Sequence, residues 1–407
     1  MDWTLLGFRE YPFSVAPINA ETLALFTGHN DAAHLLENVL MAPDVRLVIE
    51  GARGVGTTSF ANYVKFKAQA KRYYLAPRDE VSVETNWHLE ALLTAVISTI
   101  VRELEMAYLS RVKNNKIFLE AKALCQRLSE AYNSFGVTAF SLGGNFGRAG
   151  SSTQPTFVPA TQLKFHLQDL GQLAIKLGFK NGLLIQLNNL DVNVTHSEND
   201  LMALFNSMRD YFQVPGLSWL LVGDNGLRSF IARRVDRLDD IISEKVTIHP
   251  LDKVCYHQLI QKRLQYYSLK KKTATFPLDD VTFDYLYEVA EGRLRYIFGL
   301  IQAMMHRLHL GKLVQQVSFN LAKDTIVALA KERLAKHDLS KTEQVVIDYL
   351  VKKQFAGAAE VAKETGKNRT LISKSLNKLL DEKIVYVNVK GAKRIYNLSL
   401  DAKIAFS

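Results

Sequence analysis

A glycine-rich segment near residue 50 has the spacing of a phosphate-binding loop. A strand expected over 46–50 leads into Gly51, and Gly54 and Gly56 complete the pattern G-x-x-x-x-G. Glycines at these intervals let backbone N–H groups surround a diphosphate, and the following helix presents its positive N-terminus to the anion. Thr58 stands where a hydroxyl would ligate Mg²⁺. The pattern therefore predicts ATP or ADP at this loop, with Mg²⁺ as a possible companion.

The positions that would perform hydrolysis hold uncharged residues. Thr57 replaces the lysine that reaches the terminal phosphates. Asn188 and Asn189 follow the apolar run 183–187, where phosphate-loop ATPases place one carboxylate for Mg²⁺ and one for the attacking water. Losing one preorganised electrostatic contact costs about 10²–10³ in rate, so we expect hydrolysis to be absent or very slow. Nucleotide binding stays open, since the backbone cradle survives, and a loop that binds nothing is the alternative.

The composition favours a polyanionic partner. The 407 residues are 48% hydrophobic with a net charge of +10, which favours nucleic acid over a membrane. Residues 341–407 alone hold 13 Lys and Arg against 7 Asp and Glu. Neither a signal peptide nor an apolar run of membrane-spanning length is found, so we expect a cytoplasmic protein. Two cysteines and ten histidines show no zinc-ligand spacing, and no structural metal is expected.

Strands alternate with helices in the first 250 residues. The runs 183–187 and 217–222 are apolar except for Gln186 and Ser218, which is typical of strands buried on both faces. Helices are expected at 161–178 and 197–212. This alternation predicts an α/β fold with a mostly parallel sheet and helices on both faces.

Two other regions differ from this pattern. Residues 136–160 alternate apolar residues around a Gly/Ser tip and predict a β-hairpin insertion, with a loose surface loop as the alternative. Residues 252–335 are expected to be all helical.

The last 70 residues have the pattern of a winged helix-turn-helix. Asp338 or Ser340 would cap a first helix, and a second helix over 358–365 would end at Gly366, which suits a left-handed C-terminal residue. A third helix over 368–380 is followed by two alternating strands that would form a hairpin wing.

The third helix and the wing carry the side chains of a DNA-reading surface. Short polar and long basic residues suit a helix in the major groove, and a basic hairpin tip suits phosphates. A winged helix that contacts protein is the alternative. The candidate DNA-binding residues are Arg369, Thr370, Ser373, Lys374, Asn377, Lys378, Lys390, Lys393 and Arg394.

Four further motifs resemble those of one ATPase group. Residues 25–30 (LFTGHN) are similar to the F-x-G box ahead of the phosphate loop in AAA+ ATPases of the origin-recognition initiator group. Residues 188–191 (NNLD) look like that group's D-E-L-D with the first two acids replaced by amides. Residues 221–225 (LVGDN) stand where its sensor-1 strand ends, and 292–295 (GRLR) resembles its sensor-2 motif.

The resemblance implies three domains. They are a P-loop AAA+ core over 1–250 that contains the 136–160 insertion, a helical lid over 251–335, and a winged helix over 336–407. Asp224 or Asn225 would be the sensor in the core, and Arg295 would face the γ-phosphate, with a lid–core salt bridge as its alternative.

The resemblance also implies partners. Arg233, Arg234 and Arg237 lie near the place where such proteins supply an arginine finger to a neighbouring subunit, and a solvated basic face is the alternative. The expected function is that of an initiator- or targeting-factor-like protein that binds double-stranded DNA. Partners would be a homo-oligomer or other replication, transposition or defence proteins. The alternatives are an active ATP-dependent DNA loader or motor and a P-loop transcriptional regulator.

Overall fold

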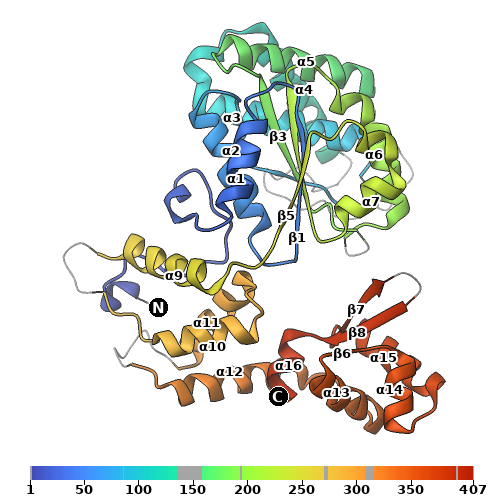
Figure 1. Cartoon of the computed structure of the whole chain (residues 1–407). Coiled ribbons are helices and arrows are strands. Elements are labelled where there is room, and N and C mark those ends of the chain that lie inside the picture. Colours follow the sequence, from blue (N-terminus) through green and yellow to red (C-terminus); the bar gives the residue numbers. More distant parts are fainter. Residues whose placement is uncertain are drawn as a thin grey trace. The chain divides into compact units, whose positions relative to one another are not determined.

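The chain forms two compact units, seen in a computed structural model (Figure 1). The structure describes residues 2–85, 87–134, 158–192, 195–269, 274–308, 316–390 and 393–406. One unit is Ala16–Leu251, and the other combines Met1–Val15 with Asp252–Ser407. Most of the expected 136–160 hairpin lies outside the described residues, and its last residue begins a helix. No described helix is long and apolar enough to cross a membrane.

A five-stranded parallel sheet is the centre of the Ala16–Leu251 unit. Its strand order is β2-β3-β4-β1-β5, and each described pairing is parallel. Crossover helices therefore join the strands and cover both faces, as the sequence predicted. The strands are β1 (Arg46–Gly51), β2 (Val81–Ser82), β3 (Leu183–Asn188), β4 (Leu217–Gly223) and β5 (Glu244–Ile248).

Helix α1 (Asn30–Val39) precedes β1, and the other described helices of this unit lie between the strands in sequence. They are α2 (Thr57–Ala70), α3 (Leu89–Val112), α4 (Lys116–Ser134), α5 (Ala160–Lys176), α6 (Glu198–Phe212), α7 (Leu227–Arg234) and α8 (Asp236–Asp239), and a 3-10 turn at Leu23–Leu25 precedes α1.

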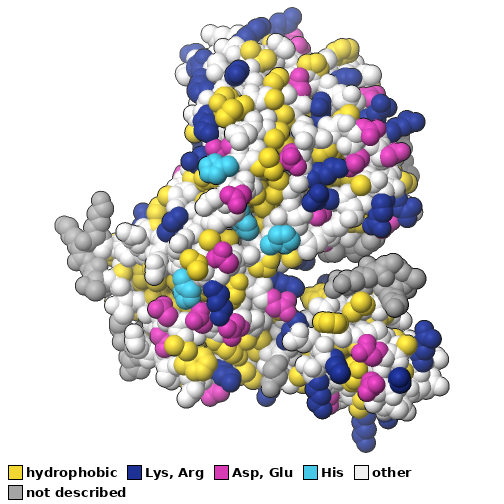
Figure 2. Space-filling view, in the orientation of Figure 1, with side chains coloured by type: hydrophobic (Ala, Val, Ile, Leu, Met, Phe, Trp, Pro, Cys, Tyr) yellow, Lys and Arg dark blue, Asp and Glu magenta, His cyan; other side chains and the backbone are white. Residues whose placement is uncertain are grey.

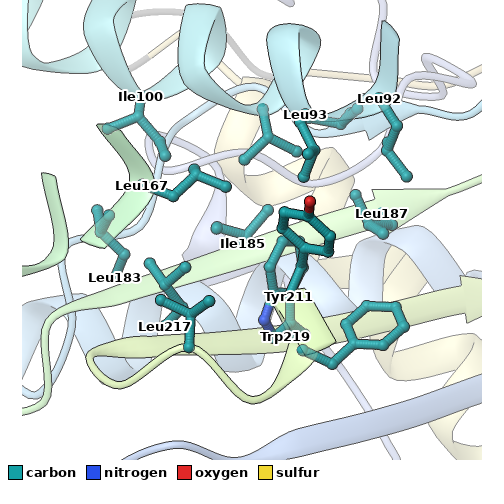
Figure 3. Packing of buried hydrophobic residues seen from close by; sticks show 14 of the residues in the cluster. Leu92, Leu93, Ile100, Leu167, Leu183, Ile185, Leu187, Tyr211, Leu217 and Trp219 are labelled. Carbon is teal, nitrogen blue, oxygen red and sulfur yellow. The ribbon is translucent and has the colours of Figure 1, made fainter. Parts of the chain in front are cut away.

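Two hydrophobic clusters explain why the central strands are mostly apolar. Leu183 and Ile185 of β3 and Trp219 of β4 point to one face, where they pack against α3, α5 and α6 (Figure 3). Leu184 of β3 and Leu220 of β4 point to the other face, into the cluster formed with α1 and α2. Because successive side chains of a strand alternate between faces, a sheet covered on both sides favours apolar residues at successive positions.

The second unit begins with helices that correspond to the expected lid. They are α9 (Lys253–Tyr267), α10 (Asp280–Val289), α11 (Leu294–Arg307) and α12 (Phe319–Leu334).

The N-terminal residues cluster with these helices rather than with the core in which the sequence analysis placed them. A 3-10 turn at Trp3–Leu6 leads to Phe13, which is fully buried. The Phe13 ring lies 4.9 Å from that of Phe276 and 5.5 Å from that of Phe298. Arg263 of α9 donates to the carbonyl of Pro12 at 2.9 Å. Aromatic burial and this hydrogen bond hold the segment on the helical unit, a long-range contact that sequence order does not reveal.

A winged helix completes the second unit. Its elements are α13 (Lys341–Lys353), β6 (Phe355–Ala356), α14 (Ala358–Thr365), α15 (Arg369–Asp381), β7 (Val385–Lys390) and β8 (Lys393–Leu398). Ser340 and Glu343 form a capping box at the start of α13, and Gly366 ends α14 at φ 66°, as their residue types predicted. The strands form an antiparallel sheet in the order β6-β8-β7.

A final helix, α16 (Leu400–Phe406), was not predicted. It packs against α12 and α13, so that it joins the lid helices to the winged helix. Asp401 accepts hydrogen bonds from the Tyr296 hydroxyl at 2.7 Å and from Arg333 at 2.9 Å. These contacts explain why the lid and the winged helix form one compact unit rather than two.

Candidate nucleotide and nucleic-acid sites

The glycine-rich loop connects β1 directly to α2. Gly54 and Gly56 have φ of 92° and 108°, values that L side chains rarely adopt. Gly56 is the N-cap of α2, and no side chain caps that helix. Because the first N–H groups of a helix have no partner within it, the uncapped start of α2 leaves donors and a positive dipole end available to an anion.

Thr57 occupies the space at the beginning of the loop. A Cβ added to Gly51 would lie 2.6 Å from the Thr57 Oγ1 atom and 2.7 Å from the Ile248 carbonyl oxygen of β5. Only glycine fits at position 51 without a shift of the backbone. The short hydroxyl side chain of Thr57 therefore packs back against the strand ends and brings no positive charge to a phosphate.

Glu50, which the sequence analysis did not single out, fixes a neighbouring helix. Its carboxylate is 9% exposed and accepts hydrogen bonds from the N–H of Gly226 at 3.1 Å and of Arg228 at 2.9 Å, at the N-terminus of α7. Thr247 of β5 donates to its other oxygen at 3.0 Å. A negative side chain at a helix N-terminus is favourable. The sequence does show a carboxylate immediately before the first loop glycine. Its role could not be predicted, because its partners lie about 175–200 residues away in sequence.

The two asparagines after β3 lie in different environments. Asn188 is 5% exposed, and its Oδ1 atom accepts a hydrogen bond from Gln186 at 3.0 Å. Asn189 is exposed and left-handed, with φ of 62°, and its carbonyl lies 3.0 Å from the ring nitrogen of His196. Asparagine tolerates this conformation better than most residues. The Asn188 side-chain oxygen and the Asn189 backbone carbonyl are thus used within the protein itself.

Asp224 follows β4 at the same edge of the sheet. Burial raises its pKa to about 6, and the negative charges of Asp191 and Glu50 add to the shift, while a hydrogen bond from the Val192 backbone opposes it. Its Oδ1 atom is buried and has no partner among the described residues. Within the described ranges, no group of three His, Cys, Asp or Glu side chains could hold a metal ion.

The face of α15 that points away from the winged-helix core is exposed and basic. Ile372, Leu376 and Leu379 are buried, whereas Arg369 and Lys374 are exposed and form no salt bridge in the described part of the chain. Figure 2 shows further Lys and Arg side chains over the winged helix, at the lower right of the view.

The remaining candidates for DNA contact differ in their environments. Lys378 donates to a carboxylate oxygen of Glu343 at 3.0 Å and to the Asp338 carbonyl at 3.1 Å, so its charge is already paired within the domain. Thr370 and Asn377 are exposed, Ser373 is half-buried, and Arg394 is exposed on β8. Lys390 and Lys393 are backbone partners at the end of the hairpin. The two residues between them lie outside the described part of the chain.

Comparison with solved structures identifies the fold. Neither a protein-family model nor a curated protein matches the sequence. The structure of the ORC2 protein of Aeropyrum pernix, in ADPNP–ADP complexes, is similar over 98% of this chain and 96% of that one, with a TM-score of 0.52 and 14% identity. A Walker-type ATPase of Pyrococcus abyssi is similar over 97% of this chain and 99% of that one, with a TM-score of 0.50 and 12% identity.

The chain has the AAA+ fold of the origin-recognition proteins. This confirms the fold that the order of the motifs implied. In this frame, Gly51–Thr58 joins β1 to α2, where the sequence predicts the phosphate loop. Asn188 ends β3 and Asp224 directly follows β4, the strand that pairs with both β3 and β1.

The arginine candidates of the AAA+ fold are all on exposed surfaces. Arg233 and Arg234 end α7 and line a hollow of about 300 Å³ together with Glu198 and Phe230. Arg234 pairs with Glu198 at 3.2 Å, an exposed ion pair. Arg295 is exposed in the first turn of α11 and belongs to the other compact unit, so its role toward the loop stays a prediction.

Proposed function

We propose that this protein binds duplex DNA through its winged helix, with α15 in the major groove and the β7–β8 hairpin against phosphates. The observation that carries the proposal is the exposed face of α15, on which Arg369 and Lys374 have no acidic partner among the residues that the structure describes. Uncompensated cations gain most from phosphates, because their binding releases condensed counterions. Side chains of Arg369, Thr370 and Asn377 are of the types that hydrogen-bond to base edges.

The AAA+ unit serves in this proposal as a scaffold that holds ATP or ADP without turning it over. The cradle suits a diphosphate, because Gly54 and Gly56 are left-handed and α2 begins without a side-chain cap. Gly54, Gly56 and Thr58 would hold the phosphates, and the Thr58 hydroxyl would face Mg²⁺. The solved ORC2 structure, which contains ADPNP and ADP, supports this part of the proposal. Bound nucleotide would stabilise the unit or control assembly with a second copy, through Arg233 or Arg234.

The biological role that fits is an initiator- or targeting-factor-like one, with hydrolysis weak or absent. Two alternative roles, an ATP-driven loader and a transcriptional regulator, would use the same contact between α15 and DNA. An ATP-driven loader would need the charges that positions 57, 188 and 189 lack. A transcriptional regulator would protect a single operator in a footprint, whereas an initiator or targeting factor would protect clustered sites at an origin or element end.

The experiment is a duplex-binding titration of the full chain and the double variant Arg369→Ala/Lys374→Ala. Loss of two phosphate or base contacts predicts at least about tenfold weaker binding and a less negative salt slope, by about 0.9 per phosphate contact.

The matched control removes the same charge from another helix of the same unit. Lys323 and Lys331 are exposed on α12, and Lys323→Ala/Lys331→Ala should change duplex affinity by less than about twofold. Equal losses in the two double variants would mean that only net charge matters, and unchanged affinity of the α15 variant would refute the role of this helix.

A further inference from the structure

The sheet of the winged helix carries a row of side chains that faces away from the helices. Phe355 of β6 and Tyr386 of β7 both pair in register with Asn397 of the central strand β8. The neighbouring residues Tyr396 and Leu398 of β8 are buried. Because side chains alternate along a strand, the row Phe355–Asn397–Tyr386 occupies the opposite face from the buried residues.

Both rings of this row are accessible. Phe355 is 62% exposed and Tyr386 is 45% exposed. Neighbouring strands are about 4.8 Å apart, which places the two aromatic residues about 10 Å from each other with Asn397 between them. Large exposed aromatic residues on a sheet mark a binding surface more often than an isolated exposed leucine does.

The charge around the row restricts the kind of partner. Residues 352–357, which include β6 and the end of α13, and residues 383–398, which include β7 and β8, together contain six Lys and Arg and no Asp or Glu. Lys352 and Lys353, at the end of α13, are exposed next to β6. Aromatic rings in a purely basic setting suit a polyanion that also has flat, apolar faces.

The amide between the rings has an unused acceptor. The Oδ1 atom of Asn397 is buried and has no hydrogen-bond partner among the described residues. Buried acceptors are nearly always satisfied, so an orphan needs an explanation. A nucleobase imide N–H, which thymine carries, is a donor of suitable size, and it would reach this oxygen once the Asn397 amide turns toward the open face of β8.

We infer that this row, with its basic flanks, is a stacking platform for unpaired bases of a DNA single strand. In a duplex the base faces are stacked on one another, so rings on a protein reach them only where the strands are separated. The inference rests on the proposed function, since it extends nucleic-acid binding from α15 to the other side of the same domain. One domain would then hold a duplex on its helix face and an opened strand on its sheet face.

The experiment measures binding of a labelled oligothymidine of about twelve nucleotides, a length within the usual site sizes, by fluorescence anisotropy of the full chain. Base–aromatic stacking is worth about 1–3 kcal/mol per base. Phe355→Ala/Tyr386→Ala should therefore weaken single-strand binding about tenfold or more. Phe355→Leu/Tyr386→Leu should weaken it similarly, because leucine keeps apolar area without a π-face. Phe355→Tyr/Tyr386→Phe should bind the single strand as tightly as the native chain, because it keeps both rings.

Controls separate this proposal from the previous one. Leu321→Ala removes an exposed apolar residue of α12 and should leave single-strand affinity unchanged. The platform variants should keep duplex affinity within about twofold, because the two rings stack on unpaired bases and do not take part in the α15 contacts with a duplex. A photo-crosslinkable halogenated uracil in the oligonucleotide should label Phe355 or Tyr386.

Three outcomes would overturn the platform. They are unchanged strand binding in the alanine variant, leucine variants that bind as well as the native rings, and a wild type that binds duplex but no single strand. The first of these would assign the row to a protein partner. If the wild type binds neither form of DNA, the proposed function fails as well, and the two failures are thereby distinguishable.

Discussion

The phosphate loop and the winged helix use their polar side chains in opposite ways. At the loop, Asn188 bonds to Gln186, Glu50 holds the start of α7, and Thr57 packs against the strand ends. On α15, Arg369 and Lys374 are exposed and pair with no acidic side chain in the described part of the domain. Polar groups with internal partners maintain a fold, whereas exposed unpaired charges are available to a ligand. The difference indicates a scaffold in one region and a binding surface in the other.

The largest expected effect concerns hydrolysis at the loop. Three charged groups are absent at positions 57, 188 and 189, and each contact of this kind is worth about 10²–10³ in rate. We expect a phosphate-release assay to give the same rate for the native chain and for Thr58→Ala. The repaired chain Thr57→Lys/Asn188→Asp/Asn189→Glu should exceed both by about 10²-fold or more.

Of the three substitutions in the repaired chain, Asn188→Asp lies at a buried position. It is compatible with the fold, because an aspartate there still accepts a hydrogen bond from Gln186. Native turnover that Thr58→Ala abolishes would break the comparison, since the loop would then be a working site. A repaired chain no faster than the native one would show that the missing charges are not what limits the reaction.

The second effect concerns stability of the AAA+ unit. Glu50→Ala leaves the N–H groups of Gly226 and Arg228 without their acceptor. A fully buried orphan donor costs about 1–3 kcal/mol, and because these two donors are only part-buried, the free energy of unfolding should fall by about 2 kcal/mol in total. Chemical denaturation followed by Trp219 fluorescence, in a Trp3→Phe/Trp87→Phe background, reports on this unit through a fully buried ring.

Glu198→Ala is the matched control, because it removes a carboxylate from an exposed pair with Arg234 and should cost about 1 kcal/mol or less. Duplex binding by Glu50→Ala should match the native chain below its unfolding transition. A Glu50→Ala variant as stable as the control would mean that this carboxylate does not organise the edge of the sheet and is free to act on a ligand.

The sequence supported the general fold more reliably than the contacts of the site. Apolar runs at 183–187 and 217–222 predicted β3 and β4, because burial on two faces leaves a local signature. The cap at Ser340 and the turn at Gly366 were also predicted, because the residue types of a helix cap and of a left-handed turn are local sequence signals as well. Glu50 and Phe13 were not, since their partners are remote in sequence and nothing beside them in the chain records the contact. The pairing of Lys378 with Glu343 likewise depends on how α13 and α15 pack.

The smallest expected effect comes from Asp224, the carboxyl group at the end of β4. Its pKa is about 6 in the folded chain and about 3.9 in an unfolded one. The folded state therefore binds the proton more tightly, and stability falls as pH rises from about 4 to about 6. Asp224→Asn removes this loss and keeps an acceptor for the Val192 N–H. Because the group is only half-buried, we expect a gain of about 1 kcal/mol at pH 8.

The gain should shrink at pH 5 and approach zero near pH 4, where the native carboxyl is neutral in the folded state and increasingly neutral in the unfolded one. The same Trp219 denaturation assay measures it, with Asp236→Asn, an exposed aspartate of α8, as the control that should show no such pH dependence. A loss of stability at pH 8 would mean that the charge of Asp224 is needed at this edge of the sheet. The loop region would then contain one carboxylate that is available to a ligand. The loop and α15 would differ only in how many such groups each presents.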